Sequence, residues 1–191
     1  MSSGSQEIAC QQVLVEDSSV FSVQWSDFPA AISGELSPEN LLQRYLVYLR
    51  RTTLSIIRPT VCPDGIQFRL LGTGFSLISF LPPEATTGSV ALRICGGLLV
   101  QQQQCHRGEL LFSVMPADAA TRVSLQLSDY CPLILGSPTP SLLRCWLYRL
   151  TQAAIHRLVT VRFLAQLYRE LSGSRTAVKI ITVAVRDGRP V

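Results

Sequence analysis

Apolar and polar residues alternate with a period of two over two parts of the chain, which is the pattern of half-buried β-strands. Near the start, Val13–Val15 and Val20–Trp25 are apolar stretches rich in β-branched residues, and they flank the turn sequence EDSS. From Ile66 to Leu127, short alternating segments follow one another without a helical pattern between them. Consecutive short strands of this kind predict an antiparallel sheet. The segments expected to form it are 66–70, 71–80, 90–95, 98–100, 110–115 and 123–127.

Apolar residues recur with helical spacing in two other segments. The first, Pro38–Arg51, follows Ser37, whose hydroxyl can cap a helix, and proline suits the first turn. The second covers residues 139–173, is introduced by the sequence SPTP and stops at Gly173, a residue typical of helix ends. After it, Thr176–Val185 is one more apolar segment rich in β-forming residues.

These elements predict a single α+β domain that spans residues 1–191. An antiparallel sheet is expected to pack on the long near-C-terminal helix, with the shorter helix near the N-terminus. Residues 1–11 and 186–191 show neither periodicity and are expected to be loose.

The long helix is apolar over more of its circumference than one sheet can cover. Residues 140–171 would span about 48 Å as one unbroken helix. One apolar face, expected to lie on the sheet, consists of Leu143, Leu147, Leu150, Ala154, Leu158, Val161, Ala165 and Tyr168. A second apolar region, which needs another partner, consists of Trp146, Ile155, Val159 and Phe163.

Several partners could cover this second region. It could be buried by the N-terminal helix and the segment Thr176–Val185, or it could form a subunit interface, where exposed apolar area often lies. It could line a ligand cavity, because Ala153 and Ala154 are small and leave space over the sheet. A membrane-surface helix is a further alternative, although such a helix needs one clean basic face, and Arg149, Arg157 and Arg162 point in different directions. The residues expected to line a cavity are Leu147, Leu150, Ala154 and Leu158.

Composition and charge narrow the classes of function. Hydrophobic residues make up 47% and charged residues 16% of the chain, which argues against disorder. The first 40 residues hold six acidic residues and no basic ones, and the rest holds 17 basic and seven acidic residues. The acidic segment is therefore expected to pack across the basic body. Sixteen of the 17 basic residues are arginines, but they are scattered rather than clustered, so no nucleic-acid partner is predicted.

The location of the protein follows from several sequence features. The longest charge-free runs have 14 residues, fewer than a membrane-spanning helix needs, so no transmembrane segment is predicted. The N-terminus has neither the basic start nor the apolar core of a secretory signal. The six cysteines form no C-x-x-C pair and are expected to be free thiols in a reducing cytosol. These features predict a cytoplasmic protein.

The sequence contains no recognisable catalytic motif. Phosphate-binding loops, dinucleotide fingerprints, nucleophile elbows and zinc-protease motifs are all missing. The only histidines are His106 and His156, and Cys105 next to His106 is expected to point to the opposite face of a strand. We therefore predict no catalytic residue, no metal ligand and no cofactor, and an enzyme ranks behind the binding functions.

The order strand, helix, antiparallel strands, long near-C-terminal helix over residues 13–173 resembles the helix-grip fold of START and Bet v 1-like domains. In that family a curved sheet wraps a long helix, and the space between them holds an apolar ligand. The sequence differs from the family in two ways, since TAVKIITVAV follows the long helix and the helix exceeds the length of one sheet. The resemblance implies a non-enzymatic binding domain for an apolar small molecule or lipid, and it transfers no catalytic residue. The alternative is an assembly protein whose second apolar helix face forms a homo-oligomer interface.

Overall fold

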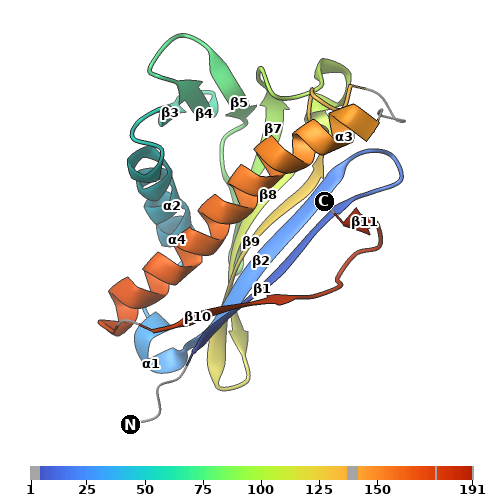
Figure 1. Ribbon diagram of the computed structural model, residues 1–191. Helices are drawn as coiled ribbons and strands as arrows, with labels where there is room; N and C mark the ends of the chain where they lie inside the picture. The colour runs from blue at the N-terminus through green and yellow to red at the C-terminus, as the bar shows by residue number, and fades with distance from the viewer. Residues whose placement is uncertain (1–4, 137–141, 175, 191) are drawn as a thin grey trace.

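The computed structural model describes residues 5–136, 142–174 and 176–190. Within these ranges the chain forms one mixed, curved sheet with two helices, α2 and α4, on one of its faces (Figure 1). The strands follow the order β10-β1-β2-β9-β8-β7-β5-β4-β3, with β6 paired to β7 and β11 paired to β1. The bounds are β1 Gln6–Leu14, β2 Val20–Pro29, α1 Ala30–Ser33, α2 Pro38–Thr52, β3 Ile57–Cys62, β4 Gly65–Leu70, β5 Ser76–Phe80, β6 Glu84–Thr86, β7 Ser89–Gly96, the 3-10 helix η1 Gln102–Arg107, β8 Glu109–Ala117, β9 Ala120–Tyr130, α3 Leu142–Tyr148, the π-helix η2 Arg149–Ala153, α4 Ala154–Ser172, β10 Val178–Thr182 and β11 Arg189–Pro190.

The α+β fold is confirmed, and most of the predicted strands are present. The strand pairs are antiparallel except β1–β10, which is parallel. Two sequence predictions are wrong in detail: residues 98–100 contribute only an isolated bridge at Val100, and strand β3 was not predicted. Cys105 and His106 lie in η1 rather than on a strand.

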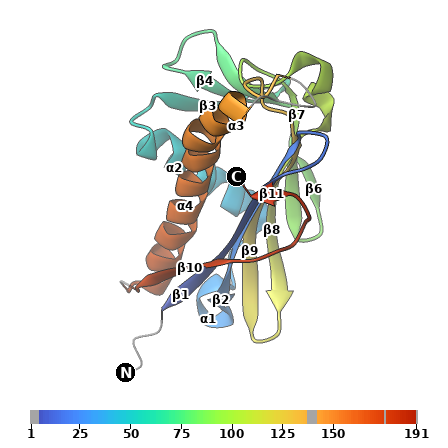
Figure 2. The same ribbon diagram turned by 45° about the vertical axis from the view of Figure 1, so that its right-hand side comes forward.

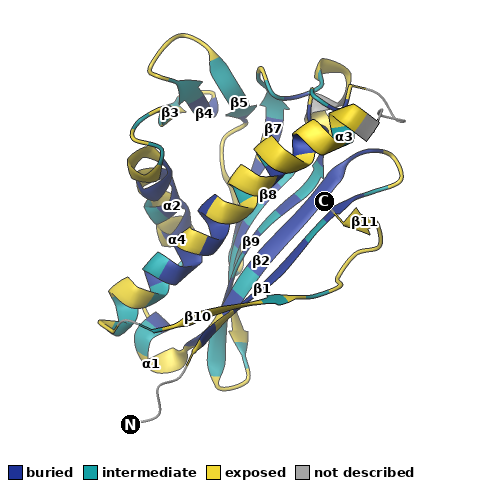
Figure 3. Cartoon of the chain, in the orientation of Figure 1, coloured by how far each residue is buried: buried dark blue, intermediate teal, exposed yellow. Residues whose placement is uncertain are grey.

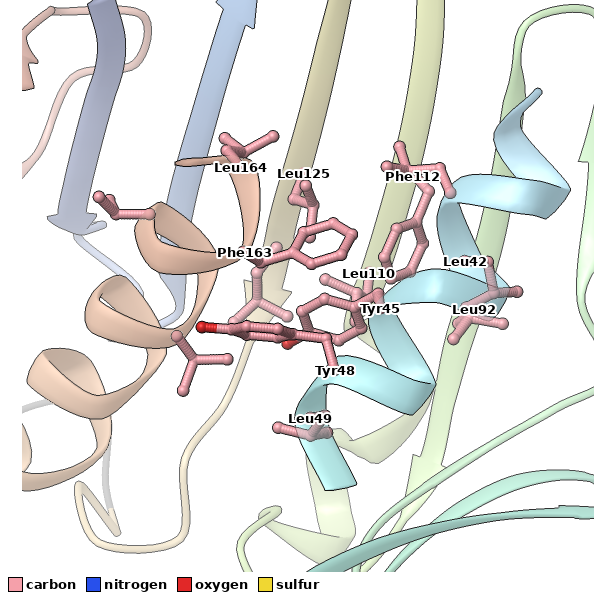
Figure 4. Close-up of a cluster of buried hydrophobic side chains, with 14 of the residues drawn as sticks. Leu42, Tyr45, Tyr48, Leu49, Leu92, Leu110, Phe112, Leu125, Phe163 and Leu164 are labelled. Atoms are coloured by element: carbon pink, nitrogen blue, oxygen red, sulfur yellow. The ribbon is translucent and has the colours of Figure 1, made fainter. Parts of the chain in front are cut away.

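Helix α2 forms where the sequence predicts it and covers the middle of the sheet. The Ser37 hydroxyl accepts a hydrogen bond from the Asn40 backbone N–H at 3.1 Å, which is the predicted cap. Its buried face meets α4 and the sheet in an aromatic cluster, where the ring of Tyr45 lies 5.2 Å from those of both Phe112 and Phe163 (Figure 4). This contact between α2, β8 and α4 forms the centre of the core.

The long helix is continuous over Leu142–Ser172, and its predicted end at Gly173 is confirmed, since this glycine adopts a left-handed conformation with φ of +65°. Residues 139–141 of the predicted helix lie outside the described residues. The helix contains one wide turn, the π-helical segment Arg149–Ala153, which accommodates one extra residue.

The face of this helix that was expected to lie on the sheet points outward over its first half. Leu143, Leu150 and Leu158 are 65%, 56% and 48% exposed, whereas Tyr148 is 2% exposed. The extra residue in the π-helical turn shifts the helical register, so positions spaced regularly through residues 140–171 cannot stay on one face. The helix instead buries Tyr148, Ala153, Val159, Thr160, Phe163, Leu164 and Leu167. Among these, Phe163 packs against Tyr45 and Tyr48 of α2.

Both ends of the described chain join the sheet, which corrects the expectation of loose termini. Gln6–Cys10 pair with Val178–Thr182, and β11 pairs with Val13 and Leu14 farther along the same edge of β1 (Figure 2). Between these two pairings the chain bends away from β1. The side chain of Gln11 holds this bend, because its carbonyl oxygen accepts hydrogen bonds from the backbone N–H groups of Val185 and Arg186.

The acidic N-terminal segment packs across the basic body, as predicted. Glu7 pairs with Lys179 at 2.7 Å, Asp27 pairs with Arg122 at 2.8 Å, and Asp17 pairs with Arg107. The segment is also structural, since β1 and β2 lie inside the sheet. In the part of the chain that the structure describes, no helix combines the length and apolarity needed to cross a bilayer.

Candidate functional site

Polar side chains lie on the covered face of strand β2, under the long helix. Ser22, Gln24 and Ser26 are 0%, 0% and 1% exposed, and they alternate with apolar residues that form a small separate cluster on the opposite face. Covering this polar row removes it from water, so each of its groups needs a hydrogen-bond partner inside the protein or in a ligand.

Two hydrogen bonds fix the long helix over this row. The Gln12 side-chain amide donates to the Ala153 carbonyl at 3.3 Å, and the Gln6 amide donates to the Leu164 carbonyl at 3.4 Å. Ala153 closes the π-helical turn, so Gln12 contacts the helix at its irregular segment. The stretch between these two contacts therefore lies over β1 and β2.

Gln24 has a polar atom without a partner in this covered region. Its amide nitrogen donates to the Ser22 hydroxyl at 2.8 Å, and its carbonyl oxygen has no hydrogen-bond partner among the described residues. Rotating the amide by 180° would let the Ser22 hydroxyl donate to the oxygen and would leave the nitrogen unpartnered instead. In either orientation one polar atom of this buried glutamine has no partner among the described protein groups, and a buried polar atom of this kind needs a hydrogen bond from water or a ligand.

Gln24 lines a pocket of about 450 Å³ between β1, the helix α4 and the C-terminal bend. The pocket lies where the chain bends away from the edge of β1 between its two pairings. Its lining residues are Cys10, Gln11, Gln12, Val13, Gln24, Arg157, Thr182, Val183, Ala184, Arg186, Asp187, Gly188 and Pro190. We call it the polar pocket.

A second hollow of about 310 Å³ adjoins the polar pocket and shares Gln12 and Arg157 with it. Apart from these two and Arg149, its lining is apolar, and the two small residues Ala153 and Ala154 leave room against the helix. The remaining lining residues are Leu158, Val161 and Ile180. We call it the apolar groove.

The charges around the two hollows are mainly basic. Within the described residues, Arg149 and Arg157 have no carboxylate within ion-pair distance, while Arg186 pairs with Asp129 at 3.1 Å and lies over the ring of Phe21. Asp187 is the one acidic residue in the lining of either hollow. Among the described residues, the two arginines are therefore the positively charged groups in these linings without an ion pair.

Two titratable side chains near the helix stay neutral at pH 7. Burial raises the pKa of the Cys10 thiol, and the neighbouring Arg157 lowers it by less. Burial lowers the pKa of His156 to about 4. Cys10 is therefore poorly suited to act as a nucleophile, and His156 adds no positive charge to the site.

The four residues predicted to line a cavity do not all lie together. Ala154 and Leu158 line the apolar groove, on the flank of the helix that faces β10. Leu147 and Leu150 are 38% and 56% exposed. Figure 3 shows that the outer side of the long helix is exposed over α3 and the start of α4. Gln12, Gln24, Arg149 and Arg157 also line the two hollows and were not among the predicted residues. The sequence signal that could have found Gln24 is the row Ser22, Gln24, Ser26 at alternate positions of an otherwise apolar strand.

Another hollow, of about 440 Å³, lies between α2 and α4 and is lined in part by Arg44, Gln166 and Glu170. Its polar groups satisfy one another, since Arg44 lies 3.4 Å from Glu170 and the Gln166 amide donates to Glu170 at 2.7 Å. Three of its polar side chains are therefore already engaged with one another. Among the described residues, no three His, Cys, Asp or Glu side chains are grouped to hold a metal ion.

The fold and the two hollows define an α+β protein with a ligand-sized site between a sheet and a long helix. No protein-family model and no curated protein matches the chain. Among solved structures, the chain is similar to CalU16 from Micromonospora echinospora, with 13% identity, a TM-score of 0.40, and coverage of 88% of this chain and 78% of that one. It is also similar to the Aha1 dimer from Colwellia psychrerythraea (15% identity, TM-score 0.39, 78% and 93% covered) and to Ms6760 from Mycobacterium smegmatis (11%, 0.39, 86% and 98%). These values are too low to assign the chain to a family.

Proposed function

We propose that the protein binds an apolar small molecule or lipid between the sheet and the long helix. The observation that carries the proposal is the apolar groove beside α4, which opens onto the polar pocket through the shared residues Gln12 and Arg157. The two volumes, about 310 and 450 Å³, fall in the range of ligand sites, which is about 300–1,000 Å³. An apolar body would lie against Ala154, Leu158 and Ile180.

Uptake of a neutral apolar fluorophore, N-phenylnaphthylamine, tests this function. We expect the wild-type protein to enhance its fluorescence and Ala154→Trp to abolish the enhancement, because the indole fills the groove. Ile155→Trp is the matched control, since Ile155 is the next residue on the same helix, is 55% exposed and does not line the groove. Absence of uptake by the wild type, or equal uptake by the two variants, would contradict the proposal.

Assembly through the outer face of the long helix is the second candidate function. Five large apolar side chains are exposed along this face, more than isolated surface residues would explain. They are Leu143, Trp146, Leu147, Leu150 and Ile155.

Light scattering coupled to gel filtration separates this function from ligand binding. A homo-oligomer that becomes a monomer in the variant Leu147→Glu/Leu150→Glu would support assembly through this face. A monomeric wild type at concentrations of about 100 μM would exclude an interface of useful strength.

A further inference from the structure

The geometry points to a ligand with an acidic head group, a carboxylate or phosphate, bound in the polar pocket by Arg157 and Gln24. This inference rests on the proposed function, because it assigns the ligand's apolar part to the apolar groove. It adds the chemical class of the head group and the residues that select it.

The negative charge of the proposed head group follows from the positive charge of Arg157. This residue lines both hollows, so a molecule that extends from one into the other lies against Arg157. The group beside it is the neutral Cys10 thiol, and within the described residues no carboxylate lies within ion-pair distance. A guanidinium offers several N–H donors in a planar fork that matches the oxygens of a carboxylate or phosphate. Arg149, at the groove side, adds a second positive charge.

Gln24 supplies the second, independent observation. It is fully buried, lines the polar pocket and keeps one polar atom without a partner. When the Ser22 hydroxyl donates to its amide oxygen, the amide nitrogen is a free donor that an acidic head group can accept from. A buried polar atom without a protein partner at the wall of a pocket is a place where a ligand can supply the missing hydrogen bond.

The position of Asp187 limits where the acidic group can lie. Asp187 lines the polar pocket from the C-terminal bend, whereas Arg157 and Gln24 come from α4 and β2. A second acidic group at the bend would be repelled, so a head group with one acidic group, placed on the helix side, fits the lining best.

Displacement of N-phenylnaphthylamine by four competitors tests the head group. Dodecanoate and dodecyl phosphate carry an acidic head, dodecanol has the same chain with a neutral head, and inorganic phosphate has no chain. We expect both acidic amphiphiles to compete roughly tenfold or more better than dodecanol, the ratio for a lost charge-assisted hydrogen bond. We expect inorganic phosphate not to compete.

Variants test whether Arg157 and Gln24 cause the preference for an acidic head group. Arg157→Gln should bring dodecanoate down to the affinity of dodecanol, while Arg162→Gln, on an exposed residue that lines neither hollow, should change nothing. The double variant Ser22→Ala/Gln24→Leu removes both members of the buried polar pair. It should weaken dodecanoate binding severalfold while its thermal unfolding midpoint stays equal to or above that of the wild type. A purely structural pair would instead give a large drop in that midpoint.

The outcomes separate this inference from the function on which it rests. Equal competition by dodecanoate and dodecanol, unaffected by Arg157→Gln, would overturn the acidic head group and leave apolar binding intact. Competition by inorganic phosphate as strong as that of dodecyl phosphate would show a small-anion site and overturn the amphiphile. Failure of the fluorophore to bind at all would remove the proposed function itself.

Discussion

At the scale of single residues, the site depends on polar side chains placed where the alternation of strand β2 does not lead one to expect them. In FSVQWS, residues 21–26, the aromatic and aliphatic positions would normally be assigned to the covered face and the polar ones to solvent. The structure places Ser22 and Gln24 under the helix and gives Phe21 and Val23 a small cluster of their own. Both faces of the strand are buried, and the neighbouring elements determine which of them the helix covers.

His156 predicts a dependence of stability on pH. Its folded pKa is about 4, below the usual 6.5 of an unfolded chain, because burial disfavours the charged form. The unfolded state therefore takes up this proton first, so the stabilisation is complete above pH 6.5 and is lost as the pH falls to about 4. The loss is up to about 3 kcal/mol, an upper value because the side chain keeps some contact with solvent.

Chemical denaturation of the wild type and of His156→Gln between pH 7 and pH 4 measures this effect. We expect the free energy of unfolding of the wild type to fall through this interval and that of the variant to fall less. Parallel curves for the two proteins would show that His156 titrates normally in the folded state.

At the scale of elements, the long helix could be predicted in its extent but not in its orientation. The helix ends at Gly173 because glycine readily adopts the left-handed conformation of a helix end, and its length follows from the helical spacing of its apolar residues; both can be read from the sequence. The wide turn at Arg149–Ala153 has no such local signal, yet it decides that Tyr148 rather than Leu150 meets the core. A regular helix through the same residues would turn other side chains toward the sheet.

Deletion of Thr151 tests whether the π-helical turn is an accommodated insertion. Thr151 is exposed, and removing one residue should convert the wide turn into a regular one while both flanks keep their faces on the sheet. We expect the thermal unfolding midpoint to stay within a few degrees of the wild type, and fluorophore uptake to persist because Ala154 and Leu158 keep their places in the groove. Failure of the variant to fold would contradict the prediction, because it would show that the fold requires the extra residue.

At the scale of the whole molecule, the site depends on the last strand segments returning to the edge of the first strand. Gly188 makes this return possible, because its φ is +157° and a Cβ there would lie 2.7 Å from the Leu14 carbonyl oxygen. The polar pocket is closed on one side by this bend. Residues more than 170 positions apart thus build one site.

Gly188→Ala should therefore detach the bend while the sheet remains folded. We expect a cost of about 1–3 kcal/mol from strain and displacement, together with faster hydrogen exchange at the amides of Val185 and Arg186, which Gln11 now holds. Hydrogen exchange followed by mass spectrometry measures this, and Gly74→Ala is the control, since a Cβ there meets no atom within 4 Å. Unchanged exchange at the bend would contradict the prediction.

The sequence by itself determined the α+β class, the capped helix α2, most of the strands and the end of the long helix, because each follows from hydrophobic periodicity or local hydrogen bonding. The tertiary structure alone decided which face of β2 and of the long helix is covered, since that depends on neighbours far away in the chain. It also decided that Gln24 and Arg157 share a pocket with the C-terminal bend. Hydrophobic periodicity shows which side chains of one segment share a face. The polar pocket forms where faces of several segments meet, and the periodicity of a single segment does not show which faces these are.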